Sequence, residues 1–377
     1  MSVVAIEKWS LPNDGAALLE MRQRLGNRRK PKTACPGWGG GIDLSYLDRL
    51  CDHLVGSYSW SKDIERFGGQ HLLIRARTSG QRLHVTLPVE RVTGARPIVL
   101  LHGWPSSSFE FVHVAKSLAA QGMFPVLTDL PGFGFSDASP EAMGPRAMAS
   151  CVAEVIREGL QLDQVIVHGN DWGSTVASWL AIDFPGLVSG VHLSMMGMRP
   201  ELSASSAPLD EAEKQWIKIV QKRLAADAGY REIQATRPNT ASVGLADSPA
   251  ALAAWMAEKF HGWTTDEGTE NPLIHMDDLA AIITSYWLTG AISSANVVYA
   301  AVRRQDDTAS PAKGTQSTPT SFSFFDGGFF PPPPISWVSR VHEVRGFKVH
   351  PFGGHYPALT NPQPLADDLI TFCDQLS

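Results

Sequence analysis

Residues 165–174 read VIVHGNDWGS, and this run places an aspartate at the centre of a glycine-flanked turn. The letters before Gly169 have the apolar composition of a buried strand, and those after Gly173 have helical spacing. Small flanking residues let a chain turn sharply from strand to helix, which exposes the middle side chain above a sheet. A carboxylate in that place, Asp171, can attack carbon and form an alkyl ester. The same letters also fit an ordinary loop in which Asp171 only caps the helix.

Short apolar runs alternate with helical patterns around this turn. We expect buried strands at 98–101, 124–128, 164–168 and 188–194, and helices between them at 109–120, 146–160 and 174–184. A β-hairpin at 71–77 and 82–87 precedes them. This alternation predicts an α/β fold with a doubly wound, mostly parallel sheet.

The pattern changes after residue 198. From 209 to 304 the letters show only helical patterns, and strands return at 319–325 and 347–350 before a last helix at 364–375. A helical block inserted into an α/β chain is typical of a lid. We therefore divide the chain into an N-terminal segment (1–70), a first part of the α/β core (71–197), an all-helical lid (198–312) and a second part of the core (313–377).

Two further motifs follow strands of the expected sheet. His102-Gly-Trp-Pro105 comes after the first buried strand, where the α/β-hydrolase fold places one amide of its oxyanion hole. The second amide belongs to the residue after the nucleophile, so the N–H groups of Trp104 and Trp172 are the expected donors. Gly353-Gly-His355-Tyr follows the last strand. Because this fold orders its triad as nucleophile, acid and base, His355 is the expected base.

Taken together, the motifs resemble those of the microsomal-type epoxide hydrolases, which are α/β hydrolases with their own N-terminal segment. The resemblance covers nearly the whole chain and rests on residues 58–61, 102–105, 169–173, 229–238, 247–249, 258–260 and 353–356. It implies that Asp171 forms a glycol monoester and that a water activated by His355 hydrolyses this ester to a vicinal diol. It also implies that two lid tyrosines, at positions matching Tyr230 and Tyr299, hydrogen-bond the epoxide oxygen.

The acid of the expected triad is its least defined member. In the family that this chain resembles, the acid stands shortly after the late strand, and here the position falls on Gly328 or Phe329. Asp326 lies on the same loop, and the glycines after it could re-aim its carboxylate, so Asp326 is the preferred partner of His355. Glu201, just after the fourth parallel strand, is the alternative. A histidine base without any carboxylate partner is the third possibility.

Two other functions share these motifs. A haloalkane dehalogenase also uses an aspartate nucleophile, and the Trp172 indole could hold its halide, but it needs neither the tyrosine pair nor the long N-terminal segment. A catalytically impaired ligand-binding relative would keep the pocket, and the missing acid favours it. A serine esterase is disfavoured because no serine stands at the centre of the turn. The preferred function is therefore hydrolysis of an epoxide that is either apolar or specific to one pathway.

Charge and composition restrict the partners. The net charge of −6 argues against a nucleic-acid-binding surface. No run approaches the ~18 apolar residues of a membrane span, and the first residues lack the pattern of a signal peptide. Four scattered cysteines favour a cytoplasmic protein. Without a metal-ligand cluster, or a third glycine after Gly132-Phe-Gly134, we expect no metal and no cofactor. The expected partners are a small-molecule epoxide and water, and a homodimer stays open.

Overall fold

The computed structural model describes residues 5–32, 35–89, 94–139, 141–203, 206–264, 273–311 and 317–376. The strands in these residues are β1 (Ile6–Trp9), β2 (Gln70–Arg75), β3 (Arg82–Leu87), β4 (Pro97–Leu101), β5 (Phe124–Thr128), β6 (Val165–Gly169), β7 (Val188–Leu193), β8 (Pro319–Phe325) and β9 (Glu343–His350). They form one sheet in the spatial order β1-β2-β3-β5-β4-β6-β7-β8-β9.

Most of this sheet is parallel. The strands from β5 to β9 in the spatial order run parallel, whereas β1, β2 and β3 form an antiparallel edge. The expected hairpin is β2–β3. The first strand, β1, was not expected from the sequence, and it pairs with β2 so that Ile6 lies opposite Ile74. The topology confirms the expected fold class.

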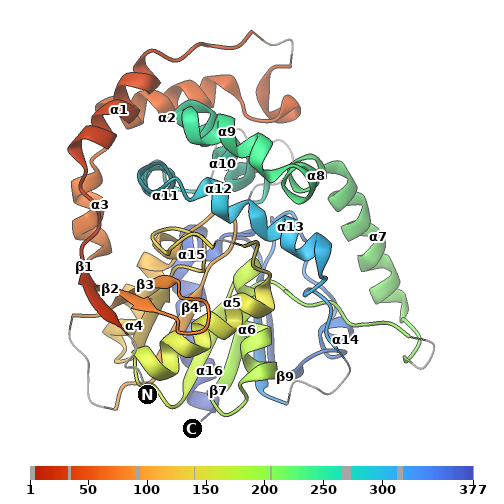
Figure 1. Cartoon of the computed structure of the whole chain (residues 1–377). Coiled ribbons are helices and arrows are strands. Elements are labelled where there is room, and N and C mark those ends of the chain that lie inside the picture. The colour runs from red at the N-terminus through yellow and green to blue at the C-terminus, as the bar shows by residue number, and fades with distance from the viewer. Residues whose placement is uncertain are drawn as a thin grey trace.

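Helices cover both faces of the sheet (Figure 1). One layer contains α4 (Val112–Ala120) and α16 (Pro362–Gln375), which contact each other. The other contains α5 (Pro145–Glu154) and α6 (Trp172–Asp183). Every residue of β5 and β6 is buried, as their continuous apolar letters require of strands covered on both faces. Short helical turns occupy Gly37–Gly40, Ser108–Phe111 and Val155–Gly159.

Between β7 and β8 the described chain is helical apart from one isolated bridge, Arg199 to Ala309. The helices are α7 (Glu211–Ala226), α8 (Gly229–Thr236), α9 (Pro238–Asp247), α10 (Pro249–Gly262), α11 (Met276–Thr289), α12 (Ile292–Ala295) and α13 (Val297–Arg304). They lie above the sheet in Figure 1. Helix α7 begins at a capping box, in which the side chains of Asp210 and Glu213 each accept a hydrogen bond from the other residue's backbone N–H. Two short helices, α14 (Ile335–Val338) and α15 (Pro357–Thr360), flank β9.

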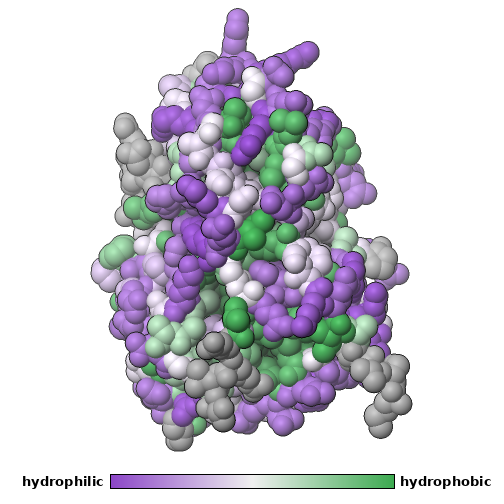
Figure 2. Space-filling view, turned by 90° about the vertical axis from the view of Figure 1, so that its left-hand side faces the viewer, coloured by the Kyte–Doolittle hydropathy of each residue, from purple (hydrophilic) through white to green (hydrophobic). Residues whose placement is uncertain are grey.

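The N-terminal segment wraps around the outside of these helices. It contains α1 (Gly15–Gly26), α2 (Leu44–Gly56) and α3 (Trp60–Phe67), and both α1 and α2 pack against α10. Figure 2 shows the left-hand side of Figure 1, whose surface is largely hydrophilic with apolar residues in small patches. Among the described residues, no helix is both long and apolar enough to cross a membrane. The boundaries assigned above to the lid and core stay predictions.

Candidate active site

The turn after β6 has the sharp geometry expected of it. Asp171 adopts φ 50° and ψ −127°, a backbone conformation with positive φ that residues other than glycine rarely adopt. A Cβ atom on Gly169 would lie 2.3 Å from the carbonyl oxygen of Gly173, and one on Gly173 would lie 2.0 Å from that of Leu101. Only glycine therefore fits on either side of the aspartate. A Cβ on Gly103 would lie 2.1 Å from the Asp171 carboxylate, so the neighbouring loop also approaches it closely.

Two groups lie next to the Asp171 carboxylate. The backbone N–H of Trp104 donates to its Oδ1 at 2.8 Å, and the His355 Nε2 lies 3.3 Å from its Oδ2. The carboxylate is nearly buried, with 12% of the side chain exposed. Trp172 is the first residue of α6, so its amide lies at a helix N-terminus, where negative charge is favoured. The structure therefore brings together Asp171, His355 and both residues of the expected oxyanion hole.

Backbone contacts and one neighbouring indole position His355. It follows Gly353 and Gly354, whose φ angles of 136° and 65° need glycine. Its own N–H donates to the carbonyl oxygen of Trp263 at 2.8 Å. The Trp263 indole meets the imidazole edge-on, with ring centroids 5.0 Å apart. These contacts place the imidazole beside the nucleophile.

The two lid tyrosines lie in the same site. Tyr230 belongs to α8 and Tyr299 to α13, and their ring centroids are 5.7 Å apart. The Trp104 indole stacks on Tyr230 at 5.1 Å and meets Tyr299 edge-on at 5.7 Å. Burial, and then the negative charge of Asp171, raise the pKa of the Tyr230 phenol above its usual range, and burial does the same for Tyr299. Both phenols therefore keep their protons and can donate hydrogen bonds.

A cavity of about 440 Å³ opens onto these groups, and we call it the catalytic cavity. Its wall is largely apolar, with several charged side chains. The lining residues are Asp171, Trp172, Thr175, Met195, Met196, Gly197, Arg199, Leu224, Tyr230, Arg231, Glu232, Ala235, Tyr299, Val302, Arg303, Thr308 and Phe330. A concave, mainly apolar site with a few convergent polar groups is typical of small-molecule binding.

The expected acid partner of His355 is not in place. The Asp326 carboxylate is exposed and accepts a hydrogen bond from the N–H of Gly327 at 2.9 Å. Its backbone bonds to both His350 and Gly354 and so continues the β8–β9 pairing. The burial of β8 continues through Phe325 and ends at Asp326, whose side chain lies at the surface. The prediction that Asp326 orients His355 is therefore not met.

Glu201 does not replace it. Its side chain is exposed and lines a different hollow, beside α7. Among the described residues, the only carboxylate within 4.0 Å of the His355 ring is Asp171 itself. A Cβ on Gly328 would lie 3.0 Å from the Cα of Gly354, so position 328 is the one whose side chain would point at the histidine loop. The third possibility, a histidine without a carboxylate partner, fits this geometry.

His355 instead lines a second cavity, of about 160 Å³, which we call the histidine cavity. Its other lining residues are Ser194, Met195, Met196, Trp216, Val220, Phe324, Phe325, Gly328, Phe330, Pro331, Pro332, Pro333 and Gly354. Apart from the Ser194 hydroxyl, these side chains are apolar or absent. The charged imidazolium form of His355 thus has apolar surroundings on this side, where a carboxylate would have stabilised it.

Sequence reasoning missed a buried carboxyl group under the site. Glu110 is fully buried and accepts a hydrogen bond from the side-chain amide of Asn170 at 3.2 Å. The same amide donates to the His355 carbonyl at 2.8 Å, and the Ser194 hydroxyl donates to Asn170 at 3.0 Å. Burial and the negative charge of Asp171 raise the pKa of Glu110 to about 8, against the opposing hydrogen bonds. Glu110 is thus protonated at neutral pH, and it supports Asn170, which joins the nucleophile turn to the histidine loop.

A buried lysine was missed as well. The side chain of Lys259 in α10 is 5% exposed and pairs with Asp227 at 2.6 Å and with Glu258 at 2.8 Å. Its Nζ lies 4.6 Å from the ring centroid of Tyr230, a cation–π distance. The positive charge therefore lies next to the phenol expected to donate to the substrate. No local sequence pattern distinguishes such a buried lysine from a solvated lysine on a helix surface.

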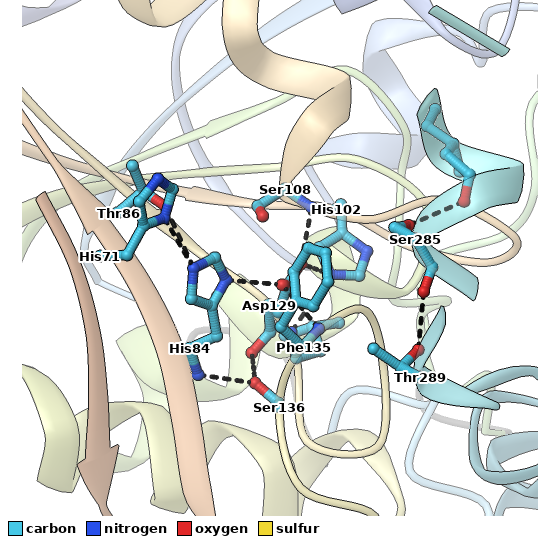
Figure 3. A network of polar contacts seen from close by, with 12 residues as sticks. His71, His84, Thr86, His102, Ser108, Asp129, Phe135, Ser136, Ser285 and Thr289 are labelled. Carbon is cyan, nitrogen blue, oxygen red and sulfur yellow. Dashed lines mark hydrogen bonds and ion pairs between the residues drawn. The ribbon is translucent and has the colours of Figure 1, made fainter. Parts of the chain in front are cut away.

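The oxyanion loop stands on a buried polar network, shown in Figure 3. Asp129, which is fully buried, accepts hydrogen bonds from the His84 ring at 2.8 Å and from the N–H of Ser108 at 2.7 Å. Burial acts to raise the pKa of Asp129, but the bond from His84, the His84 and His102 imidazoles and the N–H of Phe135 lower it to about 2. The His102 ring accepts from the N–H of Leu130 at 3.1 Å. The network thereby fixes the loop that carries the Trp104 amide.

The described residues contain no group of three or more His, Cys, Asp or Glu side chains placed to hold a metal ion. Gly132 and Gly134, the two glycines of the incomplete dinucleotide motif, belong to a tight turn. A Cβ on Gly134 would lie 2.4 Å from the Asp129 carboxylate. Close packing against Asp129 therefore explains Gly134 without a phosphate ligand.

Comparisons with known proteins agree with this geometry. Residues 96–239 match the family model described as alpha/beta hydrolase fold, and residues 6–111 match the model described as Epoxide hydrolase N terminus. A juvenile hormone epoxide hydrolase of Manduca sexta is 27% identical, over 97% of this chain and 85% of its own. Epoxide hydrolase 1 of Sus scrofa is 26% identical, over 88% of this chain and 80% of its own.

Solved structures give the same result. The structure of Aspergillus niger epoxide hydrolase superposes with a TM-score of 0.83 at 25% identity, covering 100% of this chain and 98% of that one. The juvenile hormone epoxide hydrolase of Bombyx mori also reaches a TM-score of 0.83, at 23% identity, over 99% of this chain and 94% of that one. The second likeness supports the fold alone.

Proposed function

We propose that this chain, which belongs to the microsomal-type epoxide hydrolases, opens its epoxide through a covalent ester on Asp171 and releases a vicinal diol. The observation that carries this proposal is the position of the Asp171 carboxylate. It lies between the Trp104 amide and the His355 imidazole, in a cavity that it shares with two protonated tyrosines. The nucleophile and two acids thus line one cavity, and the base reaches the nucleophile from the adjoining histidine cavity.

In the first step, a carboxylate oxygen of Asp171 attacks one epoxide carbon. The C–O bond of the ring breaks, and its electron pair stays on the epoxide oxygen. Tyr230 and Tyr299 donate hydrogen bonds to this developing alkoxide, and one of the two phenols transfers its proton to it to form the first hydroxyl of the diol. Donors already in place in a site poor in water stabilise the charge as it develops. The cation–π contact of Lys259 with Tyr230 supports the phenol as the donor.

In the second step, His355 takes a proton from a water that attacks the ester carbonyl carbon. The N–H groups of Trp104 and Trp172 stabilise the resulting oxyanion. The tetrahedral intermediate collapses, the bond from the carboxyl carbon to the alkyl oxygen breaks, and that oxygen receives the proton held by His355. The diol leaves, and the Asp171 carboxyl group returns the remaining proton of the water to the deprotonated phenol, so the carboxylate and both tyrosines are restored.

We expect ester hydrolysis to be slower than ring opening, because the His355 imidazole faces the apolar histidine cavity. When His355 takes the water's proton it becomes a cation, and no described carboxylate other than Asp171 lies within 4.0 Å to stabilise it. Asp171 is itself neutral as an ester at that point. The attack of Asp171 does not need a charged histidine, so ring opening is spared. We therefore expect the ester to accumulate during turnover.

The source of the diol oxygens tests the covalent route. In a single turnover in heavy-oxygen water, with enzyme in excess, the first diol should carry no heavy oxygen, because its new oxygen comes from Asp171. The label should enter the carboxyl group of Asp171 and reach the diol only in later cycles. Heavy oxygen in the diol of the first turnover would mean that water attacks the epoxide directly. Asp171→Asn, which replaces the nucleophile by a poor one, should form no diol on this time scale.

The two rival functions are separated by product analysis. A haloalkane dehalogenase would release halide from bromoalkanes, whereas the tyrosine pair described above suits an epoxide oxygen. A ligand-binding relative without turnover is favoured only by the missing acid. It predicts that an epoxide such as styrene oxide is bound and recovered unchanged, with no ester and no diol.

A further inference from the structure

Three arginines line the catalytic cavity together with the nucleophile. Arg199 comes from the segment after β7, Arg231 from α8 and Arg303 from α13, and α8 and α13 lie side by side (Figure 1). We propose that these arginines bind an anionic group, and that the substrate is an epoxide on an apolar chain that ends in a carboxylate. This inference rests on the proposed function and specifies its substrate class.

The arginines outnumber the carboxylates that face them. Arg199 pairs with Asp306, and Glu232 is shared by Arg231 at 3.8 Å and Arg303 at 3.3 Å. Three guanidinium groups thus face two carboxylates, which leaves one positive charge (3 − 2 = 1) apart from the nucleophile.

The guanidinium groups are accessible to a ligand. The side chains of Arg231 and Arg303 are 36% and 57% exposed, so a substrate group can reach them without breaking a buried ion pair. A guanidinium presents parallel N–H donors that match the two oxygens of a carboxylate. A neutral epoxide would gain little from them. The apolar side chains of the cavity, among them Leu224, Val302 and Phe330, provide the surface for a hydrocarbon chain.

The helix end alone does not explain these residues. Arg303 and Arg304 both stand in the last turn of α13, where cations are favoured by the helix dipole. Arg304 satisfies that preference by donating to the carbonyl oxygen of Ala300, and it does not line the cavity. Arg303 faces the cavity, as Arg199 and Arg231 do from other segments. Arg304 is therefore a matched control for a positive charge on the same helix.

The test compares epoxidised fatty acids of about ten or more carbons with their methyl esters, by diol formation. At low ionic strength we expect the acid to have a kcat/KM about fivefold above that of its ester, the weight of one exposed ion pair, mainly through a lower KM. High salt should reduce this preference by screening it. In the double variant Arg231→Gln and Arg303→Gln the ratio of acid to ester should fall to about one. Arg304→Gln should keep the wild-type ratio.

The possible results distinguish failure of the anion site from failure of the proposed epoxide hydrolysis. Equal turnover of acid and ester by the wild-type protein, or a preference that survives in the double variant, would refute the anion site and leave epoxide hydrolysis intact. Loss of the preference in Arg304→Gln would also refute it, because the effect would then come from net charge alone. Absence of diol from every acid and every ester would instead overturn the proposed function.

Discussion

Glu110 ties the stability of the fold to pH. Its pKa is about 8 in the folded chain, against an ordinary value of 4.5. That difference is worth up to about 5 kcal/mol, at about 1.4 kcal/mol for each tenfold change in proton affinity. Below pH 4.5 both states hold the proton. Between 4.5 and 8 the unfolded chain loses it and the folded chain keeps it, so this contribution to the free energy of unfolding falls as pH rises, and it levels off above 8.

The perturbation is Glu110→Gln, which keeps an oxygen to accept from Asn170 and removes the titration. Urea unfolding from pH 5 to 9 should show a wild-type free energy of unfolding that declines with pH more steeply than that of the variant, by several kcal/mol over the range. Glu65→Gln, which changes an exposed glutamate, is the control and should follow the wild type. Parallel curves for wild type and Glu110→Gln would refute the reasoning, because they would mean that Glu110 titrates alike in both states.

Ionisation of Glu110 should also affect catalysis, because it adds a second negative charge near Asp171. The alkaline limb of kcat/KM that this causes near pH 8 should be absent in Glu110→Gln and present in Glu65→Gln. An unchanged limb in Glu110→Gln would assign it to another group.

Three further substitutions test the roles assigned to the site. Gly328→Asp places a carboxylate at the position facing the histidine loop, where the backbone of Gly354, 3.0 Å from the added Cβ, must shift by a few tenths of an ångström; stopped-flow measurements should show faster ester hydrolysis and unchanged ring opening. Lys259→Met removes the cation over Tyr230 and should slow ring opening about tenfold, which is the effect of losing about 1.4 kcal/mol of transition-state stabilisation; a change confined to ester hydrolysis would contradict this. Tyr230→Phe and Tyr299→Phe should each slow ester formation, and the pair together should nearly abolish it, as quenched-flow detection of the ester would reveal.

The parts of the site that the sequence predicts are those set by short local motifs. Glycine is required at positions 103, 169 and 173, because backbone or carboxylate atoms lie 2.0–2.3 Å from where a Cβ atom would be. The sequence reveals such a steric requirement as a glycine at each position. The strands are equally visible, because strands buried on both faces need continuous apolar runs.

The parts that could not be predicted depend on contacts between distant segments. The direction of Asp326 follows from how β8 pairs with β9, which spacing along the chain does not reveal. Glu110 and Lys259 stand in helical turns where charged residues are normally solvated, and only the folded chain buries them. The first strand, Ile6–Trp9, is four residues long and gains its structure from pairing with β2.

The most direct test of the central claim is the intact mass of the protein during turnover. Quenched in acid within the first turnovers on an epoxide, the chain should gain the mass of one epoxide, and peptide mapping should place the adduct on Asp171. Because the described residues give His355 no carboxylate partner besides Asp171, the adduct should be a large fraction of the enzyme at steady state and should disappear when the epoxide is exhausted. Continuous diol formation by a protein that never carries an adduct on Asp171, in wild type or in His355→Gln, would contradict the account.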